Sequence, residues 1–106
     1  MERRNLVKGA FHFVIKGCSR EYKGDGKTAC RVGAATTVEM LRNRIQSKKG
    51  LNEAAKDAAR RCENAYLDTP GRSPYKYPGQ LQTICIQSVN DVIRIVRRGR
   101  GLGRAK

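Results

Sequence analysis

The chain has 106 residues, a length that suits one domain and leaves little room for a second. Lysine and arginine number 23 against nine acidic residues, which gives a net charge of +14 at neutral pH. An excess of this size attracts polyanions, nucleic acid first and anionic membranes second, and is larger than solubility alone requires. No apolar stretch approaches the roughly 18 residues of a membrane-spanning helix, so none is expected.

Residues 10–17 read AFHFVIKG, in which Phe11, Phe13 and Ile15 alternate with more polar neighbours. Alternation with a period of two residues is typical of a half-buried strand. The next residues, CSREYKGDGKT, form a polar, glycine-rich segment that predicts a turn.

Two helices are predicted next, over about 29–46 and about 52–67, separated by the sequence SKKG. Each carries apolar residues at helical spacing, as expected of a helix with one buried face. The first stripe is Val32, Ala35, Val38, Leu41 and Ile45, and the second is Leu51, Ala55, Ala58, Cys62 and Ala65. Their short connection predicts a helical hairpin.

All three prolines fall within residues 68–80, which we expect to form an exposed loop. The sequences LQTICIQ (81–87) and DVIRIVR (91–97) then indicate two strands, joined at the turn-like SVND. The order strand, helix, helix, strand, strand predicts an α+β fold, a small two-layer sandwich in which an antiparallel sheet of three or four strands carries the helical hairpin on one face. We expect a single basic domain over 1–97 and a flexible Arg/Gly-rich tail over 98–106.

The four cysteines lie 12, 32 and 23 residues apart. Zinc sites usually contain close pairs such as C-x2-C, and this chain has none, so disulfides and ordinary buried thiols are the stronger alternatives. The N-terminal apolar run is short, contains His12 and lacks a clear signal-peptidase site. We expect an intracellular protein; a secreted protein whose signal sequence has been removed is the alternative.

Catalytic patterns are scarce. The sequence GDGKT resembles part of a phosphate-binding loop, but Glu21 stands where that motif needs glycine. His12 is the one histidine, and no cysteine spacing pairs it with a nucleophile. We therefore expect a protein that is not an enzyme and holds no metal or cofactor, and a small basic nuclease stays open as an alternative.

Residues 11–41 resemble the last strand, Gly-x-Gly turn and final helix of a double-stranded-RNA-binding domain. The residues that carry the resemblance are Gly24, Gly26, Lys27, Thr28, Arg31, Ala34, Ala35 and Leu41. In that family, basic residues at the helix start contact phosphates, whereas Ala29 and Cys30 stand there in this chain. Only ten residues precede Phe11, too few for the family's earlier helix and strands, so the resemblance is confined to less than a third of the chain.

Basic residues accompany tyrosines in the predicted loop and glycines at the C-terminus, two arrangements suited to nucleic acid. The predicted binding residues are Arg72, Tyr75, Lys76 and Tyr77 in the loop, with Arg94, Arg97, Arg98, Arg100, Arg104 and Lys106 toward the C-terminus. Smaller basic clusters are Arg3/Arg4, Arg42/Arg44/Lys48/Lys49 and Arg60/Arg61.

The favoured function is a non-catalytic nucleic-acid-binding protein, with RNA favoured over DNA. It would grip the phosphate backbone within a ribonucleoprotein or virion that also contains protein partners. The alternative is a secreted, cationic, disulfide-stabilised effector, similar to a killer toxin, that acts on an anionic cell surface. Free thiols favour the first function and disulfides favour the second.

Overall fold

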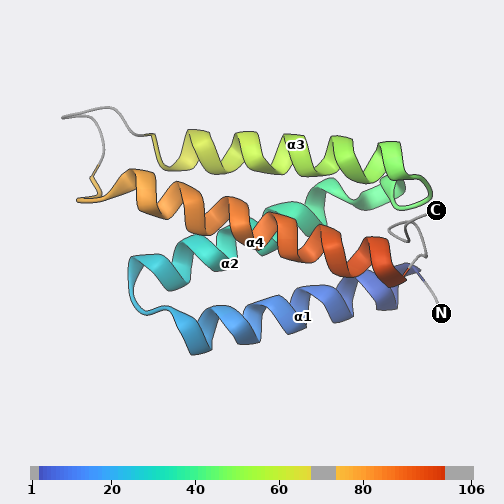
Figure 1. Ribbon diagram of the computed structural model, residues 1–106, viewed down its shortest axis with the longest axis horizontal. Helices are drawn as coiled ribbons and strands as arrows, with labels where there is room; N and C mark the ends of the chain where they lie inside the picture. The colour runs from blue at the N-terminus through green and yellow to red at the C-terminus, as the bar shows by residue number, and fades with distance from the viewer. Residues whose placement is uncertain (1–2, 68–73, 100–106) are drawn as a thin grey trace.

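The computed structural model of the protein describes residues 3–67 and 74–99. These ranges hold helices α1 (Arg3–Glu21), α2 (Asp25–Met40), α3 (Lys48–Ala65) and α4 (Pro78–Gly99), with a short 3-10 helix, η1 (Arg42–Arg44), after α2. Successive helices run antiparallel along the longest dimension of a body measuring 45 × 26 × 24 Å (Figure 1). The architecture is an up-down-up-down four-helix bundle.

The predicted α+β sandwich is therefore wrong. The described ranges contain no strand, and all three predicted strands lie within helices. The predicted helical hairpin is present as α2 and α3, which pack against each other, although α2 begins and ends earlier than the sequence indicated.

Helix α1 replaces the first predicted strand. Its buried residues, Ala10, Val14 and Cys18, are spaced four apart and form one row on the helix. The alternating apolar residues that suggested a strand are arranged otherwise, since Phe13 is 67% exposed whereas Phe11 and Ile15 are half-buried. The bulky side chains misled the prediction because the residues that face the core of α1 are mostly small.

Helix α4 replaces the two C-terminal strands. Its buried residues recur at three and four positions over the whole length of the helix, namely Leu81, Cys85, Ser88, Val89, Val92, Ile93 and Val96. The many β-branched residues favoured strands locally, yet a helix buries this stripe in full. The segment SVND, predicted as a turn, lies in the middle of the helix. The helix continues to Gly99, two residues beyond the boundary expected for the tail.

Helices α2 and α4 form the centre of the bundle and approach each other very closely. The buried residues of α2 are all small: Ala29, Cys30, Gly33, Ala34 and Thr37. A Cβ atom placed on Gly33 would lie 2.2 Å from the backbone oxygen of Cys85, so only glycine fits there. Ser88 Oγ donates a hydrogen bond of 2.6 Å to the Cys30 carbonyl oxygen across the same contact. This close packing places the small face of α2 inward, and Ala35, one of the predicted core residues, is exposed.

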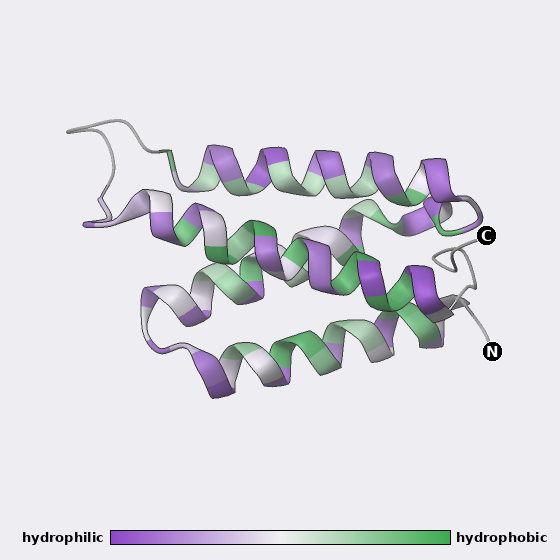
Figure 2. Cartoon of the chain, in the orientation of Figure 1, coloured by the Kyte–Doolittle hydropathy of each residue, from purple (hydrophilic) through white to green (hydrophobic). Residues whose placement is uncertain are grey.

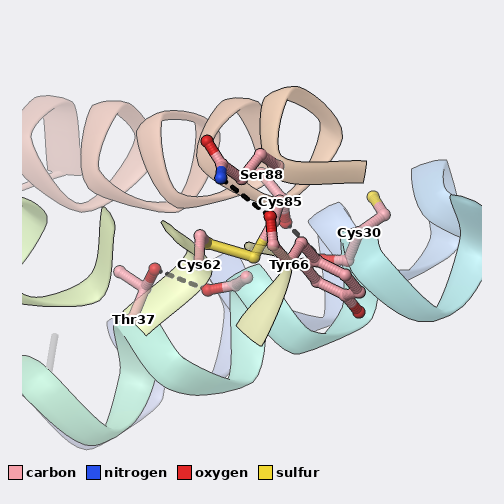
Figure 3. The surroundings of a disulfide bond; sticks show 8 residues. Cys30, Thr37, Cys62, Tyr66, Cys85 and Ser88 are labelled. Carbon is pink, nitrogen blue, oxygen red and sulfur yellow. Dashed lines mark hydrogen bonds between the residues drawn. A yellow bond between two sulfur atoms is a disulfide. The ribbon is translucent and has the colours of Figure 1, made fainter. Parts of the chain in front are cut away.

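All four cysteines form disulfides, which settles the alternatives left open by their spacing. Cys18–Cys30 joins α1 to α2, and Cys62–Cys85 joins α3 to α4. Figure 3 shows the second bridge beside Tyr66 and Ser88, and every cysteine is buried. Each bridge closes a short loop, 12 or 23 residues apart in sequence, and contributes about 3 kcal/mol to stability. The bridges supplement a core that is built largely from alanine, valine and cysteine.

Candidate anion-binding surfaces

One end of the bundle gathers three cationic segments that are distant in sequence. They are the start of α1, residues 42–49 around η1, and the end of α4 (Figure 1). Two contacts bring the end of α4 to the other helices: Gly99 lies against the side chain of Leu6 in α1, and Arg97 Nη2 donates a hydrogen bond of 2.7 Å to Asn52 Oδ1 in α3, three residues after Lys49. The exposed cations of this region, called here the cationic end, are Lys8, Arg42, Lys48, Lys49 and Arg98.

The charges at the cationic end serve helix stability only in part, since Arg98 lies in the last turn of α4, where a cation is favourable, but Lys48 and Lys49 begin α3. Both α1 and α3 begin here, and neither has an acidic residue in its first turn. A helix N-terminus carries a positive partial charge of about half an elementary unit, so cations such as Lys48 and Lys49 are unfavourable there. Because α2 and α4 end where α1 and α3 begin, the partial charges of the helix termini offset one another, and the positive potential at this end comes from its five exposed cations.

Three other cations are engaged in ion pairs within the described residues. Arg44 Nη1 lies 2.7 Å from Asp57 Oδ2 and joins η1 to α3, while Arg61 pairs with Glu39 and Arg94 with Asp91. The hydrogen bond from Arg44 lowers the pKa of Asp57 below its ordinary value. Arg44 and Arg61 thereby connect elements of the fold.

The outer face of α1 carries a second concentration of positive charge. Lys8, His12, Lys16 and Arg20 are exposed and spaced four apart, so they form a row that extends about 18 Å along the helix. The single acidic residue of α1 is Glu21, its last residue. We call this set of four residues the α1 row.

Phe13 projects from the helix next to the α1 row. Its side chain is 67% exposed, and Gly9 and Gly17, one turn away on either side, add no side chain that would cover it. Phe13 also lines a groove of about 250 Å³ between α1 and α4, together with the apolar residues Val14, Ile84 and Ile95. Charged residues of both signs line the same groove, namely Arg20, Glu21, Asp91 and Arg94. Phe13 is therefore an exposed aromatic residue at the edge of a groove that is partly apolar and partly charged, next to the cations of the α1 row.

The predicted loop residues do not form one surface in the described structure. Tyr75 is half-buried, and its ring lies 5.2 Å from the ring of Tyr66, measured between centroids. Burial also raises the pKa of the Tyr66 phenol. Lys76 and Tyr77 are exposed, with Lys76 Nζ 5.7 Å from the Tyr77 ring centroid, and Arg72 lies outside the described residues.

The predicted C-terminal residues are separated into two settings. Arg94 and Arg97 line a groove between α3 and α4, while Arg98 is exposed at the cationic end. Arg100, Arg104 and Lys106 lie outside the described residues. Their role in binding stays a prediction.

Reasoning from sequence missed the α1 row and Phe13, because residues 10–17 were interpreted as a strand. Once α1 is known to be a helix, the spacing of Lys8, Lys16 and Arg20 identifies the row at once. The cluster of Arg42, Lys48 and Lys49 was recognised from the sequence, but its proximity to the ends of α1 and α4 required the fold.

Fold and surface together define a disulfide-bridged four-helix bundle with a strongly cationic exterior. Across the parts of the chain that the structure describes, no helix is both long enough and apolar enough to cross a bilayer. No protein-family model, curated protein or solved structure matches the chain.

Proposed function

We propose that the protein is a disulfide-stabilised cationic effector that binds the anionic lipid surface of a cell through the outer face of α1. The two buried disulfides carry this proposal, because they separate the two functions that the sequence left open. Disulfides form and persist in oxidising surroundings and are rare where glutathione keeps thiols reduced. All four cysteines are bridged, which favours the secreted effector over the intracellular nucleic-acid-binding protein.

The chemistry of α1 supports a lipid target. Each lysine or arginine near an anionic membrane contributes about 1 kcal/mol of attraction, and the α1 row offers three. An aromatic side chain among such cations enters the boundary between headgroups and acyl chains, as Phe13 is placed to do. The disulfide to α2 keeps α1 helical and fixed while it binds, so little conformational entropy is lost.

Nucleic-acid binding remains the second candidate, and a different surface favours it. The cationic end combines exposed lysines and arginines without an aromatic residue, an arrangement suited to phosphate backbones. Helix α4 ends there at Gly99, within the segment 98–106 that was predicted as the tail.

The two functions are tested with the oxidised, full-length chain. Binding is measured to phosphatidylglycerol-containing vesicles, to pure phosphatidylcholine vesicles, to a structured RNA and to a DNA duplex, each across a salt series. The proposal expects saturable binding to the anionic vesicles that persists, although weakened, at about 150 mM salt, because the apolar contact of Phe13 is not screened. Binding to RNA alone, lost on substitution of Lys48 and Lys49 by glutamine, would favour the second candidate and overturn the first.

A further inference from the structure

A groove of about 550 Å³ lies between α3, at the top of Figure 1, and α4, which crosses the centre of the view. Its polar lining residues are Asn52 and Lys56 from α3 and Asn90, Arg94 and Arg97 from α4. Ala55 and Ile93 also line it, and the small side chain of Ala55 leaves the hollow between the helices. Three cations and two amides thus surround an open space.

The groove has more hydrogen-bond donors than acceptors. Arg97 uses Nη2 to donate to Asn52 Oδ1 at 2.7 Å, and its Nε is buried without a partner among the described residues. That contact occupies the oxygen of Asn52, so the amide nitrogen remains to donate. Lys56 is exposed and adds three N–H donors.

Nearby carboxylates do not neutralise the groove. None is among its lining residues. Asp91 lies 3.1 Å from Arg94 Nη2 and offsets one of the three positive charges, while Asp57, next to Lys56 in sequence, is held by Arg44. The groove therefore keeps an excess of about two positive charges, and two of its cations are planar guanidinium groups. This combination matches a doubly charged oxyanion.

We propose that this groove binds a phosphate monoester group, carried either by a small molecule or by the headgroup of a phosphorylated lipid. A phosphate monoester carries nearly two negative charges at neutral pH and three acceptor oxygens, which fits the charge and the surplus of donors. Arg94 and Arg97 provide charge-assisted hydrogen bonds, Lys56 provides a mobile cation, and the two asparagines orient the oxygens. This site is separate from α1 and does not depend on the function proposed above.

The test uses the oxidised, full-length chain labelled with 15N. Amide shifts are followed during titration with inorganic phosphate, with glycerol 3-phosphate and with a short-chain phosphatidic acid below its micellar concentration, and sodium chloride of matched ionic strength serves as the reference. We expect saturable shifts confined to residues near 52–56 and 90–97. If the phosphatidic acid binds more tightly than the other two probes, the natural ligand is a phosphorylated lipid. If all three probes bind equally, the groove recognises the phosphate group alone.

The variant K56Q/R94Q removes two exposed cations from the groove and is expected to weaken phosphate binding at least about tenfold, the loss of one charge-assisted hydrogen bond or more. K49Q/R60Q is the matched control, because it removes the same amount of charge from α3 outside the groove. Its affinity for phosphate should stay within about twofold of that of the original chain. R97K keeps the positive charge but loses the planar guanidinium group with its paired N–H donors, and should also weaken phosphate binding. Amide shifts that never saturate, or equal losses of phosphate affinity in both double variants, would overturn the proposal. Either result would leave the proposed binding of vesicles through α1 untouched.

Discussion

Helices α1 and α3 have no contact with each other in the described structure and present very different outer faces to solvent. On α3, exposed acids are interspersed among more numerous bases, as in Glu53, Lys56, Arg60 and Glu63, and Figure 2 shows a largely polar outer edge. On α1, the exposed charges are positive up to Glu21, and hydrophobic residues interrupt them.

The two outer faces differ in what their charged residues do. Charged residues of α3 take part in ion pairs that support the fold, whereas those of α1 are available to a partner. Asp57 and Arg61 of α3 form ion pairs with Arg44 and Glu39, and so connect α3 to η1 and α2. A surface that needs only to be soluble carries both signs of charge and few exposed aromatic rings. The outer face of α3 meets that description, whereas the outer face of α1, with Phe13 beside its cations, does not.

Each disulfide holds one of the two compared helices, and their removal should have the largest effect. Replacing Cys62 and Cys85 by alanine is expected to lower the free energy of unfolding by about 2–5 kcal/mol. Replacing Cys18 and Cys30 should cost about half a kcal/mol less, because the loop is shorter. Urea denaturation of both pairs checks this, and unchanged stability in either would mean that the bridge adds nothing to the core.

Reversing charge on the two faces tests the comparison directly. K8E/K16E is expected to weaken binding to anionic vesicles at least about tenfold, because each cation contributes about 1 kcal/mol near the membrane. K49E/R60E changes the net charge by the same amount on α3, leaves the pair between Arg61 and Glu39 intact, and should lower affinity much less. Equal losses in vesicle sedimentation would show that only net charge matters and that α1 is not the contact surface.

One exposed apolar residue on α1 and one next to α3 test whether an apolar contact contributes to vesicle binding. Phe13→Ala should weaken vesicle binding about tenfold, the equivalent of burying much of one aromatic side chain, with little change in stability since Phe13 is already 67% exposed. Leu67→Ala, at the end of α3, removes a side chain that is 53% exposed and is the matched control. If Leu67→Ala proves as harmful as Phe13→Ala, the apolar contact lies elsewhere.

The smallest expected effect is a loss of stability at low pH, caused by protonation of Asp57 in α3. The folded-state pKa of Asp57 is lowered, so its pair with Arg44 stabilises the fold above the ordinary aspartate value of 3.8 and is lost as the pH falls through the lowered value. Thermal unfolding between about pH 5 and pH 2 should therefore show a component that Asp57→Asn removes. Phe13→Ala should leave that component intact, and a pH profile unchanged by Asp57→Asn would contradict the stabilising role.

The sequence predicted part of the fold well and part of it poorly, for identifiable reasons. The second helix was found because Leu51, Ala58 and Cys62 recur at helical spacing among charged residues, and all three are buried in α3. Helix α4 was missed because isoleucine, valine and threonine favour strands over short windows, whereas its buried stripe emerges only over the longer span from Leu81 to Val96. The spacing of the four cysteines left both thiols and disulfides open, and only the packing of the helices brings the cysteines together in pairs.

Composition and order of residues by themselves determined an excess of positive charge and two consecutive helices, because these depend on counting and on local patterns. The predicted turn over residues 18–28 was only partly right, since α1 continues to Glu21 and α2 begins at Asp25. Only the tertiary structure decided that the small residues of α2 face α4, which cysteines are paired, and which cations share a surface. Those features arise from packing between segments far apart in sequence. Lys8, Lys48 and Arg98 lie at one end of the molecule because antiparallel helices bring their termini together.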